Sequence, residues 1–149
     1  MAHRPRRSSI KLRPGAALSA TRFALGHDRL VYVLIASRAI RYPNGKSRIA
    51  YIGTTKKGTS RIAQSVATRA DSILGLRGVK SFDARVLTCR NRQNVKMWFA
   101  LERALIVTFR EEFGEIPHCN IKGKSMQANR VFEIFARERV RRLIRNLSE

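Results

Sequence analysis

The sequence predicts an α+β domain: a small, mostly antiparallel three-stranded sheet flanked by helices, with its elements in the order ββαβαα. Two short runs rich in β-branched and aromatic residues lie on either side of a strong turn signal, which predicts a hairpin. Segments with helical spacing of apolar residues surround a third strand-like run. A length of 149 residues and a hydrophobic fraction of 44% suit one domain with a modest core.

The first two strands are predicted over residues 30–41 and 48–54, which read LVYVLIASRAIR and RIAYIGT. Between them lies Tyr42-Pro43-Asn44-Gly45, a turn signal because Asn-Gly tolerates positive φ. The two strands therefore form an antiparallel hairpin that brings Tyr32 and Tyr51 near its open end.

A helix is predicted next, over residues 60–74, with Thr59 as its N-cap and with Gly75 and Gly78 at its end. Residues 81–89 (SFDARVLTC) then alternate in polarity, which predicts the third strand of the sheet.

Two more helices are predicted towards the C-terminus. The longer covers residues 95–113, with Asn94 as a candidate cap and Gly114 just beyond its end. The last covers residues 127–147 and carries arginines outside an apolar stripe of Val131, Phe132, Phe135, Val140, Leu143, Ile144 and Leu147.

The chain is strongly basic, because 31 Lys+Arg against 10 Asp+Glu give a formal net charge of +21. Such a surface needs an anionic partner. Nucleic acid is the first candidate, since neutralising its phosphates releases counterions. An anionic membrane surface is the second. A structural RNA-binding role, as in a ribosomal protein, fits the charge equally well.

Three parts are expected: a basic, flexible arm at 1–29, a folded domain at 30–123, and an Arg-rich amphipathic helix at 124–149 packed on that domain. The arm is either a solvated tail or a segment that contacts nucleic acid. No apolar run approaches the roughly 20 residues of a membrane span, and the N-terminus lacks the apolar core of a secretory signal. Cys89 and Cys119 have no metal-site spacing and favour a reduced, cytoplasmic chain, nucleoid-associated if it is prokaryotic or from a phage.

Glu102 is out of place on the longer helix. Six apolar residues share one face of that helix at i, i+3 and i+4 spacing: Val95, Trp98, Phe99, Leu105, Ile106 and Phe109. Glu102 falls on the same face, where a carboxylate needs a cation or hydrogen-bond donors. It is either half of a structural ion pair or a metal ligand facing a cleft, since Mg²⁺ often takes only one or two protein carboxylates.

Other candidate residues lie on the hairpin and the first helix. Arg61 falls in the first turn of its helix, where it either holds an anion together with free N–H groups or is one more surface arginine. Tyr32 and Tyr51 are either packing residues with wet hydroxyls or part of a phosphodiester-cutting surface. Gly53 lets the chain leave the sheet abruptly.

These residues resemble the GIY-YIG nuclease superfamily over residues 30–123. The family's first motif is similar to Val31-Tyr32-Val33, and its second is matched by Tyr51-Ile52-Gly53. Arg61 stands ten residues after Tyr51, the usual position of the family's arginine.

The later motifs of the family are also matched. Glu102 lies on a later helix, as the family's metal-binding glutamate does, and Asn120 resembles its closing asparagine. Many members carry a histidine four residues after the arginine, and here that position is Ser65.

The resemblance implies a metal-dependent endonuclease that hydrolyses DNA phosphodiester bonds. In that mechanism Glu102 holds Mg²⁺ or another divalent cation such as Mn²⁺. Tyr32 or Tyr51 activates the attacking water, with Tyr32 the first choice. Arg61 stabilises the transition state, and Asn120 braces the site by hydrogen bonds.

The implied partner is double-stranded or branched DNA, without a membrane, and the chain acts alone, as a homodimer or with a partner subunit. Contacts, mostly to phosphates, are expected from basic residues of the hairpin and loops: Arg41, Lys46, Lys56, Lys57, Lys122 and Lys124. The alternative is a catalytically degenerate or structural nucleic-acid-binding protein.

Overall fold

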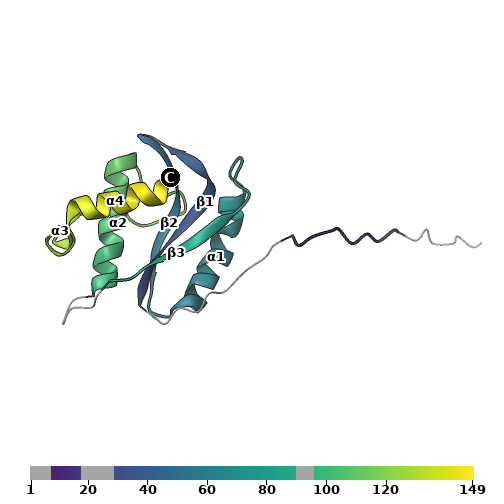
Figure 1. The fold of residues 1–149 in the computed structure, drawn as a ribbon, viewed down its shortest axis with the longest axis horizontal. Helices are drawn as coiled ribbons and strands as arrows, with labels where there is room; N and C mark the ends of the chain where they lie inside the picture. The colour runs from purple at the N-terminus through teal and green to yellow at the C-terminus, as the bar shows by residue number, and fades with distance from the viewer. Residues whose placement is uncertain (1–7, 18–28, 90–95) are drawn as a thin grey trace, which may run out of the picture.

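A three-stranded antiparallel sheet lies at the centre of the computed structural model, which describes residues 8–17, 29–89 and 96–149 (Figure 1). Its strands are β1 (Leu30–Tyr42), β2 (Gly45–Thr55) and β3 (Phe82–Leu87), in the order β2-β1-β3. β1 is the middle strand, and it pairs antiparallel with both neighbours. The predicted α+β class and three-stranded sheet are confirmed.

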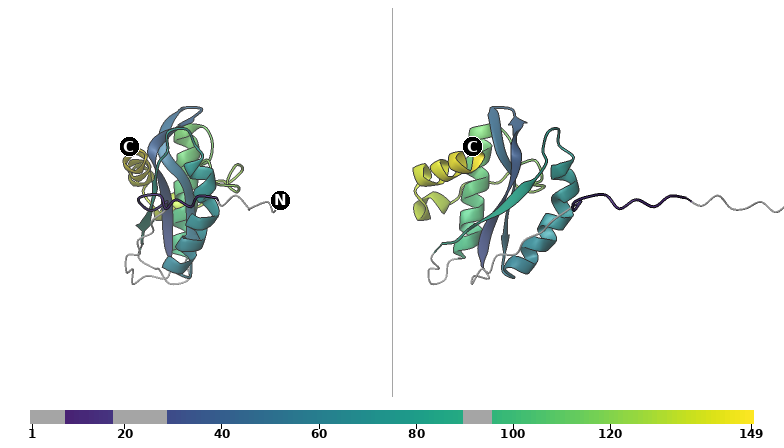
Figure 2. Two further views of the ribbon diagram at one scale, coloured as in Figure 1. Left: turned by 90° about the vertical axis from the view of Figure 1, so that its right-hand side faces the viewer. Right: turned by 45° about the vertical axis from the view of Figure 1, so that its right-hand side comes forward.

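Helices cover both faces of the sheet, as Figures 1 and 2 show. One face carries α1 (Thr59–Leu74), and the other carries α2 (Met97–Phe113), α3 (Val131–Ile134) and α4 (Arg137–Ser148). Buried side chains fill both layers: Ile62 and Ile73 come from α1, Leu105 and Phe109 from α2, and Ile144 from α4. The sheet is therefore the middle layer of three.

The hairpin forms as predicted. Tyr32 pairs with Gly53, close to the open end of the hairpin, and the chain turns between Tyr42 and Gly45. The turn is held from outside the hairpin, because the backbone N–H of Asn44 donates to the Phe113 carbonyl at 3.0 Å. The end of α2 therefore fixes the closed end of the hairpin.

The first helix begins one residue earlier than predicted, and its predicted N-cap is wrong. Gly58, not Thr59, occupies the cap position, with φ of 61°, and Thr59 is the first helical residue. Glycine enters this left-handed region without steric cost, so the chain turns into α1 without a hydroxyl cap.

The long helix agrees with the prediction except at its beginning and in one core residue. α2 ends at Phe113 with Gly114 in the left-handed conformation. Its predicted beginning at Val95 with Asn94 as N-cap is wrong, because Lys96 is the N-cap residue and Met97 the first helical residue. Asn94 and Val95 themselves lie outside the described residues. Phe99, predicted on the buried face, is 41% exposed. The reason is its spacing, three residues after Lys96 and four before Arg103, which places Phe99 on the basic face of the helix.

The single helix predicted over residues 127–147 is wrong. Phe135 and Ala136 are extended and separate α3 from α4. Arginines of α2 instead bind carbonyl groups of the segment before α3: Arg103 donates to Gln127 O, and Arg110 donates to the carbonyls of Gly123, Lys124 and Met126. Asn129 also has φ of 48°, which an α-helix does not allow.

The C-terminal helix is fastened to α2 and β2. Its arginines pair with two glutamates of α2: Arg137 with Glu111 at 3.1 Å, Arg141 with Glu112 at 3.0 Å, and Arg145 with Glu112 at 3.3 Å. The hydroxyl of Ser47 in β2 donates to Ser148 Oγ at 2.7 Å. The last helix therefore belongs to the same folded unit as the sheet.

Only residues 8–17 of the predicted N-terminal arm, together with Arg29, are described. Residues 8–17 form no helix or strand, and their side chains are exposed. Within the described parts of the chain, no helix is long and apolar enough to cross a bilayer.

Candidate active site

Tyr32 and Tyr51 meet on the face of the sheet that α1 covers. Their ring centroids are 5.8 Å apart and the rings are inclined by 43°. Gly53 lies against both rings: a Cβ atom at this position would come within 2.6 Å of Tyr51 Cε1 and 3.0 Å of Tyr32 Cζ. Any side chain at position 53 would displace the tyrosines, so their pairing requires glycine there.

The hydroxyl of Tyr32 is engaged by α1. Tyr32 is 2% exposed, and its hydroxyl donates to Ser65 Oγ at 2.7 Å. Ser65 Oγ also accepts a hydrogen bond from Arg69 Nη1 at 2.8 Å. Ser65 thus links the first tyrosine to an arginine.

Arg69 is a site residue that the sequence prediction missed. Its guanidinium carbon lies 3.7 Å from the centroid of the Tyr51 ring, in the range of a cation–π contact. Its spacing could have indicated this position, since Arg61, Ser65 and Arg69 follow one another at intervals of four and so share one face of α1. Arg69 therefore connects the two tyrosines from the helix side.

Tyr51 is the more accessible of the paired tyrosines. Burial raises its pKa to about 12, the neighbouring Tyr32 and Glu102 add to the rise, and the Arg69 guanidinium opposes it. Tyr51 is therefore protonated at neutral pH and offers a hydrogen-bond donor to a ligand.

Asn120 fastens the edge of the sheet beside the tyrosines. Its Oδ1 accepts from the backbone N–H of Ile52 at 3.0 Å, and its Nδ2 donates to the Ile52 carbonyl at 2.9 Å. The neighbouring backbone N–H of Cys119 donates to the Ala50 carbonyl at 2.8 Å. The Asn120 amide thus replaces the backbone of a further strand and fixes the residue between Tyr51 and Gly53.

Arg61 lies in the first turn of α1, and its side chain is exposed. Its Nη1 donates to Gln64 Oε1 at 3.1 Å. Gln64 is neutral, and no ion pair among the described residues includes Arg61. The positive charge of Arg61 is therefore open to an anionic ligand.

Glu102 is a partly buried carboxyl group near Tyr51. Burial raises its pKa to about 7, and the Arg103 guanidinium opposes the rise. None of the ion pairs in the described part of the chain includes Glu102. A hard oxygen ligand without a salt-bridge partner suits a divalent cation.

Glu102 is the one predicted metal ligand, and the structure adds no second acidic group to it. Residues 8–17, 29–89 and 96–149 contain no cluster of three or more His, Cys, Asp or Glu side chains suited to a metal. A cation at Glu102 would complete its shell with water and substrate oxygens, as Mg²⁺ commonly does.

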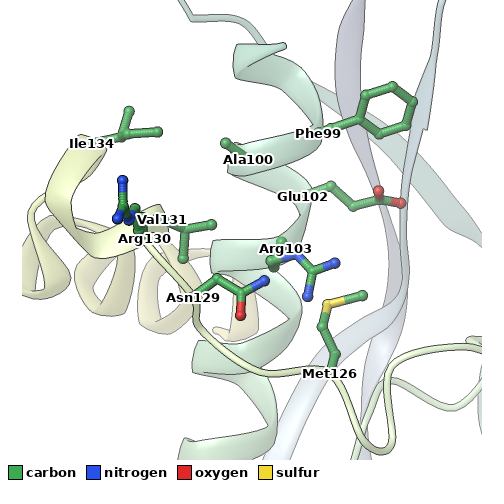
Figure 3. Close-up of a pocket in the computed structure, with 9 residues that line it drawn as sticks. All are labelled: Phe99, Ala100, Glu102, Arg103, Met126, Asn129, Arg130, Val131 and Ile134. Carbon is green, nitrogen blue, oxygen red and sulfur yellow. The ribbon is translucent and has the colours of Figure 1, made fainter. Parts of the chain in front are cut away.

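A hollow of about 500 Å³ lies beside Glu102, between α2 and the segment that leads into α3. Its lining includes Phe99 and Glu102, whose side chains extend to one side of α2 in Figure 3, and Val131 and Ile134, which lie on the other side of that helix. Arg103 lies between the two sides. The candidate metal ligand therefore borders a space large enough for part of a substrate.

The six predicted nucleic-acid contacts do not form one patch. All are exposed: Arg41, Lys46, Lys56, Lys57, Lys122 and Lys124. Arg41 pairs with Lys46 near the closed end of the hairpin, whereas Lys56 follows the opposite end of β2. The Lys56 ammonium lies 5.8 Å from the centroid of the Phe99 ring, so this lysine is beside the hollow.

No protein-family model, curated protein or solved structure matches this chain.

Proposed function

We propose that this chain is a metal-dependent endonuclease that hydrolyses DNA phosphodiester bonds at the tyrosine pair. The observation that carries the proposal is the meeting of residues from separate parts of the chain: Tyr32 and Tyr51 pack over Gly53, and Asn120 fixes the intervening Ile52. The net charge of +21 supports a polyanionic substrate.

Glu102 would hold the cation, Mg²⁺ or Mn²⁺. When bound, the cation supplies charge neutralisation at a phosphate oxygen and lowers the pKa of a bound water. The carboxyl has a pKa of about 7 because of burial, so near neutral pH a substantial fraction is already ionised for binding. Exposed Arg61 takes the role of stabilising negative charge that develops on the transferring phosphoryl group.

We assign the water-orienting role to Tyr51 in preference to Tyr32. The hydroxyl of Tyr32 is buried and donated to Ser65, whereas Tyr51 is accessible. At a pKa of about 12 the Tyr51 phenol is protonated and positions the attacking water by a hydrogen bond. It can accept a proton from that water only where its own pKa is lowered and the phenol ionises. The Arg69 guanidinium on its ring acts in that direction.

A nucleic-acid-binding protein without catalysis is the second candidate. The observation that favours it is Ser65, whose hydroxyl already binds both Tyr32 and Arg69 and supplies no imidazole for proton transfer. The two candidates predict the same binding and differ in cleavage alone.

Nicking of supercoiled plasmid in Mg²⁺, Mn²⁺ or EDTA tests the proposal. The wild-type protein should nick only with metal, and Arg61→Ala and Glu102→Ala should each lower the rate at least about 100-fold with plasmid binding retained. Arg77→Ala and Glu115→Ala, at exposed positions outside the site, are the matched controls and should cleave normally.

Two outcomes contradict the proposal. Binding without nicking in any metal identifies the second candidate, and cleavage that persists in both site variants removes these residues from the mechanism. Branched and single-stranded substrates, together with sedimentation of the complex, give the preferred DNA structure and distinguish a monomer from a homodimer.

A further inference from the structure

The hollow beside Glu102 presents an aromatic ring to solvent. Phe99 is 41% exposed, and in the described part of the chain it is the only aromatic among the exposed large hydrophobic residues. Its neighbour Trp98 is buried in the core. An exposed phenylalanine ring is a stacking surface for any planar apolar group, and every nucleobase has such a face.

Two exposed cationic side chains reach over this ring. The ammonium groups of Lys56 and Lys96 each lie 5.8 Å from the centroid of Phe99. Lys56 follows the end of β2, and Lys96 is the N-cap residue of α2, so the two lysines come from different elements. No ion pair among residues 8–17, 29–89 and 96–149 uses either of them. Both are open to phosphates on either side of a stacked base.

The rest of the hollow is lined by polar groups that can form hydrogen bonds with a ligand. An amide, Asn129, and two guanidinium groups, Arg103 and Arg130, line it (Figure 3). An amide both donates and accepts hydrogen bonds, which matches the mixed edges of nucleobases. The volume of the hollow, about 500 Å³, lies within the usual range for small-ligand sites.

We propose that Phe99 stacks an unpaired nucleobase, while Lys56 and Lys96 hold the adjacent phosphates. A base inside an intact duplex has no free face, so the preferred ligand is DNA with an overhang, a fork, a flap or an extruded nucleotide. Phe99 is three residues from Glu102 on α2, so the unpaired nucleotide lies one helical turn from the candidate metal ligand. The stacking proposal names a substrate class for the proposed nuclease. Only the position of the nucleotide relative to the metal ligand rests on the nuclease proposal.

Binding in EDTA tests the proposal without cleavage. The full-length protein is titrated against a blunt duplex, a duplex with a single-stranded overhang and a single strand, with equal numbers of phosphates and with 2-aminopurine at an unpaired position. Phe99→Ala should weaken binding to the overhang and the single strand at least about fivefold and abolish the quenching of 2-aminopurine. Binding to the blunt duplex should change less than twofold.

Two variants make the comparison specific. Phe99→Trp keeps a larger stacking face and should retain overhang binding and quenching. Leu74→Ala removes a hydrophobic side chain of similar exposure, 36% against 41% for Phe99, at the end of α1 and should bind as the wild type does.

Equal binding of all three DNAs by Phe99→Ala and wild type would overturn the proposal. Phosphatidylserine vesicles provide a further arm: loss of vesicle binding in Phe99→Ala with unchanged DNA binding would assign the ring to a membrane surface instead. The two proposals can fail separately. If base stacking is wrong, the protein can still nick plasmid; if the nuclease proposal is wrong, plasmid is not nicked but 2-aminopurine quenching in EDTA is still observed.

Discussion

Gly53 determines how the two tyrosines share one small area of the sheet. Tyr32 and Gly53 are directly paired across the hairpin, so their side-chain positions point to the same face. The ring of Tyr51 lies over the space that a Cβ atom at position 53 would occupy. The glycine therefore has a specific steric purpose in addition to its conformational freedom.

Gly53→Ala should separate the tyrosines and abolish cleavage. The added methyl group would come within 2.6 Å of the Tyr51 ring, so Tyr51 must move. Overpacking of this kind costs about 1–3 kcal/mol of folding free energy, and an ångström-scale displacement of a reacting group lowers a rate about 100-fold. Urea denaturation and plasmid nicking measure the two effects. Thr54→Ala, one residue along the same strand, is the control, and a cleavage rate equal to wild type in Gly53→Ala contradicts a role for the pair.

Glu102 should make stability depend on pH and on metal. Because burial raises its pKa from 4.5 to about 7, ionisation costs stability as pH rises through this interval, and the full cost persists above it. Glu102→Gln should therefore be more stable than wild type by about 1–3 kcal/mol at pH 8, with little difference at pH 4. Urea denaturation at the two pH values measures this difference.

The same carboxyl group provides a metal readout that is independent of cleavage. At pH 8, Mg²⁺ or Mn²⁺ should raise the thermal midpoint of the wild type and leave Glu102→Gln unchanged, because a ligand that binds only the folded state stabilises it. Glu115→Gln, which alters an exposed carboxyl, is the control.

For the urea measurements at pH 4 and pH 8, a stability gain in Glu102→Gln that is equal at both pH values contradicts burial of the charge as its cause.

At the scale of elements, the edge of β2 depends on one side chain. β2 lies at the edge of the sheet, and the amide of Asn120 makes two hydrogen bonds to the backbone of Ile52. An edge strand without such a partner exposes its N–H and C=O groups. The loop after α2 thus stabilises the strand that carries Tyr51.

Asn120→Ala should loosen this strand locally. Loss of two hydrogen bonds to partly buried groups lowers stability by about 1–3 kcal/mol, and hydrogen exchange at the Ile52 amide should accelerate. Asn120→Asp keeps an acceptor for the Ile52 N–H and should retain much of its protection, although it loses the donor to the Ile52 carbonyl. Unchanged exchange at Ile52 in Asn120→Ala would show that the amide does not hold the strand.

Elements with local signals were predictable from the sequence. The hairpin follows from its turn and its β-branched strands, and the ends of α1 and α2 follow from Gly75 and Gly114. The break between α3 and α4 was not predictable, because no glycine or proline marks it at Phe135 and Ala136. The irregular segment before α3 was not predictable either, because Arg110 of α2 binds its carbonyls from more than ten residues away along the chain.

The same distinction applies to the candidate site. Tyr32 and Tyr51 could be placed together because they are on one hairpin. The contact between Arg69 and the Tyr51 ring could not be predicted, since it depends on how α1 packs against the sheet. The exposure of Phe99 could have been predicted from its spacing to Lys96 and Arg103 on α2.

At the scale of the whole molecule, positive charge lies at both ends of the hairpin. Arg41 and Lys46 are paired near its closed end, and Lys56 and Lys57 follow β2 at its open end. The nine residue steps from Lys46 to Thr55 span about 30 Å at the rise of a β-strand. One DNA molecule can contact both ends, but only the open end lies beside Phe99 and the hollow that Glu102 borders.

Two double variants separate the effect of location from the effect of total charge. Lys56→Gln/Lys57→Gln and Arg41→Gln/Lys46→Gln each lower the net charge from +21 to +19. If the open end holds the scissile strand, Lys56→Gln/Lys57→Gln should lower plasmid nicking much more than Arg41→Gln/Lys46→Gln. Each lost phosphate contact should also reduce the slope of log K against log[salt] by about 0.9 on duplex DNA. Equal losses of nicking in both variants would mean that net charge, not the position of these residues, governs cleavage, and would separate the lysines from the site.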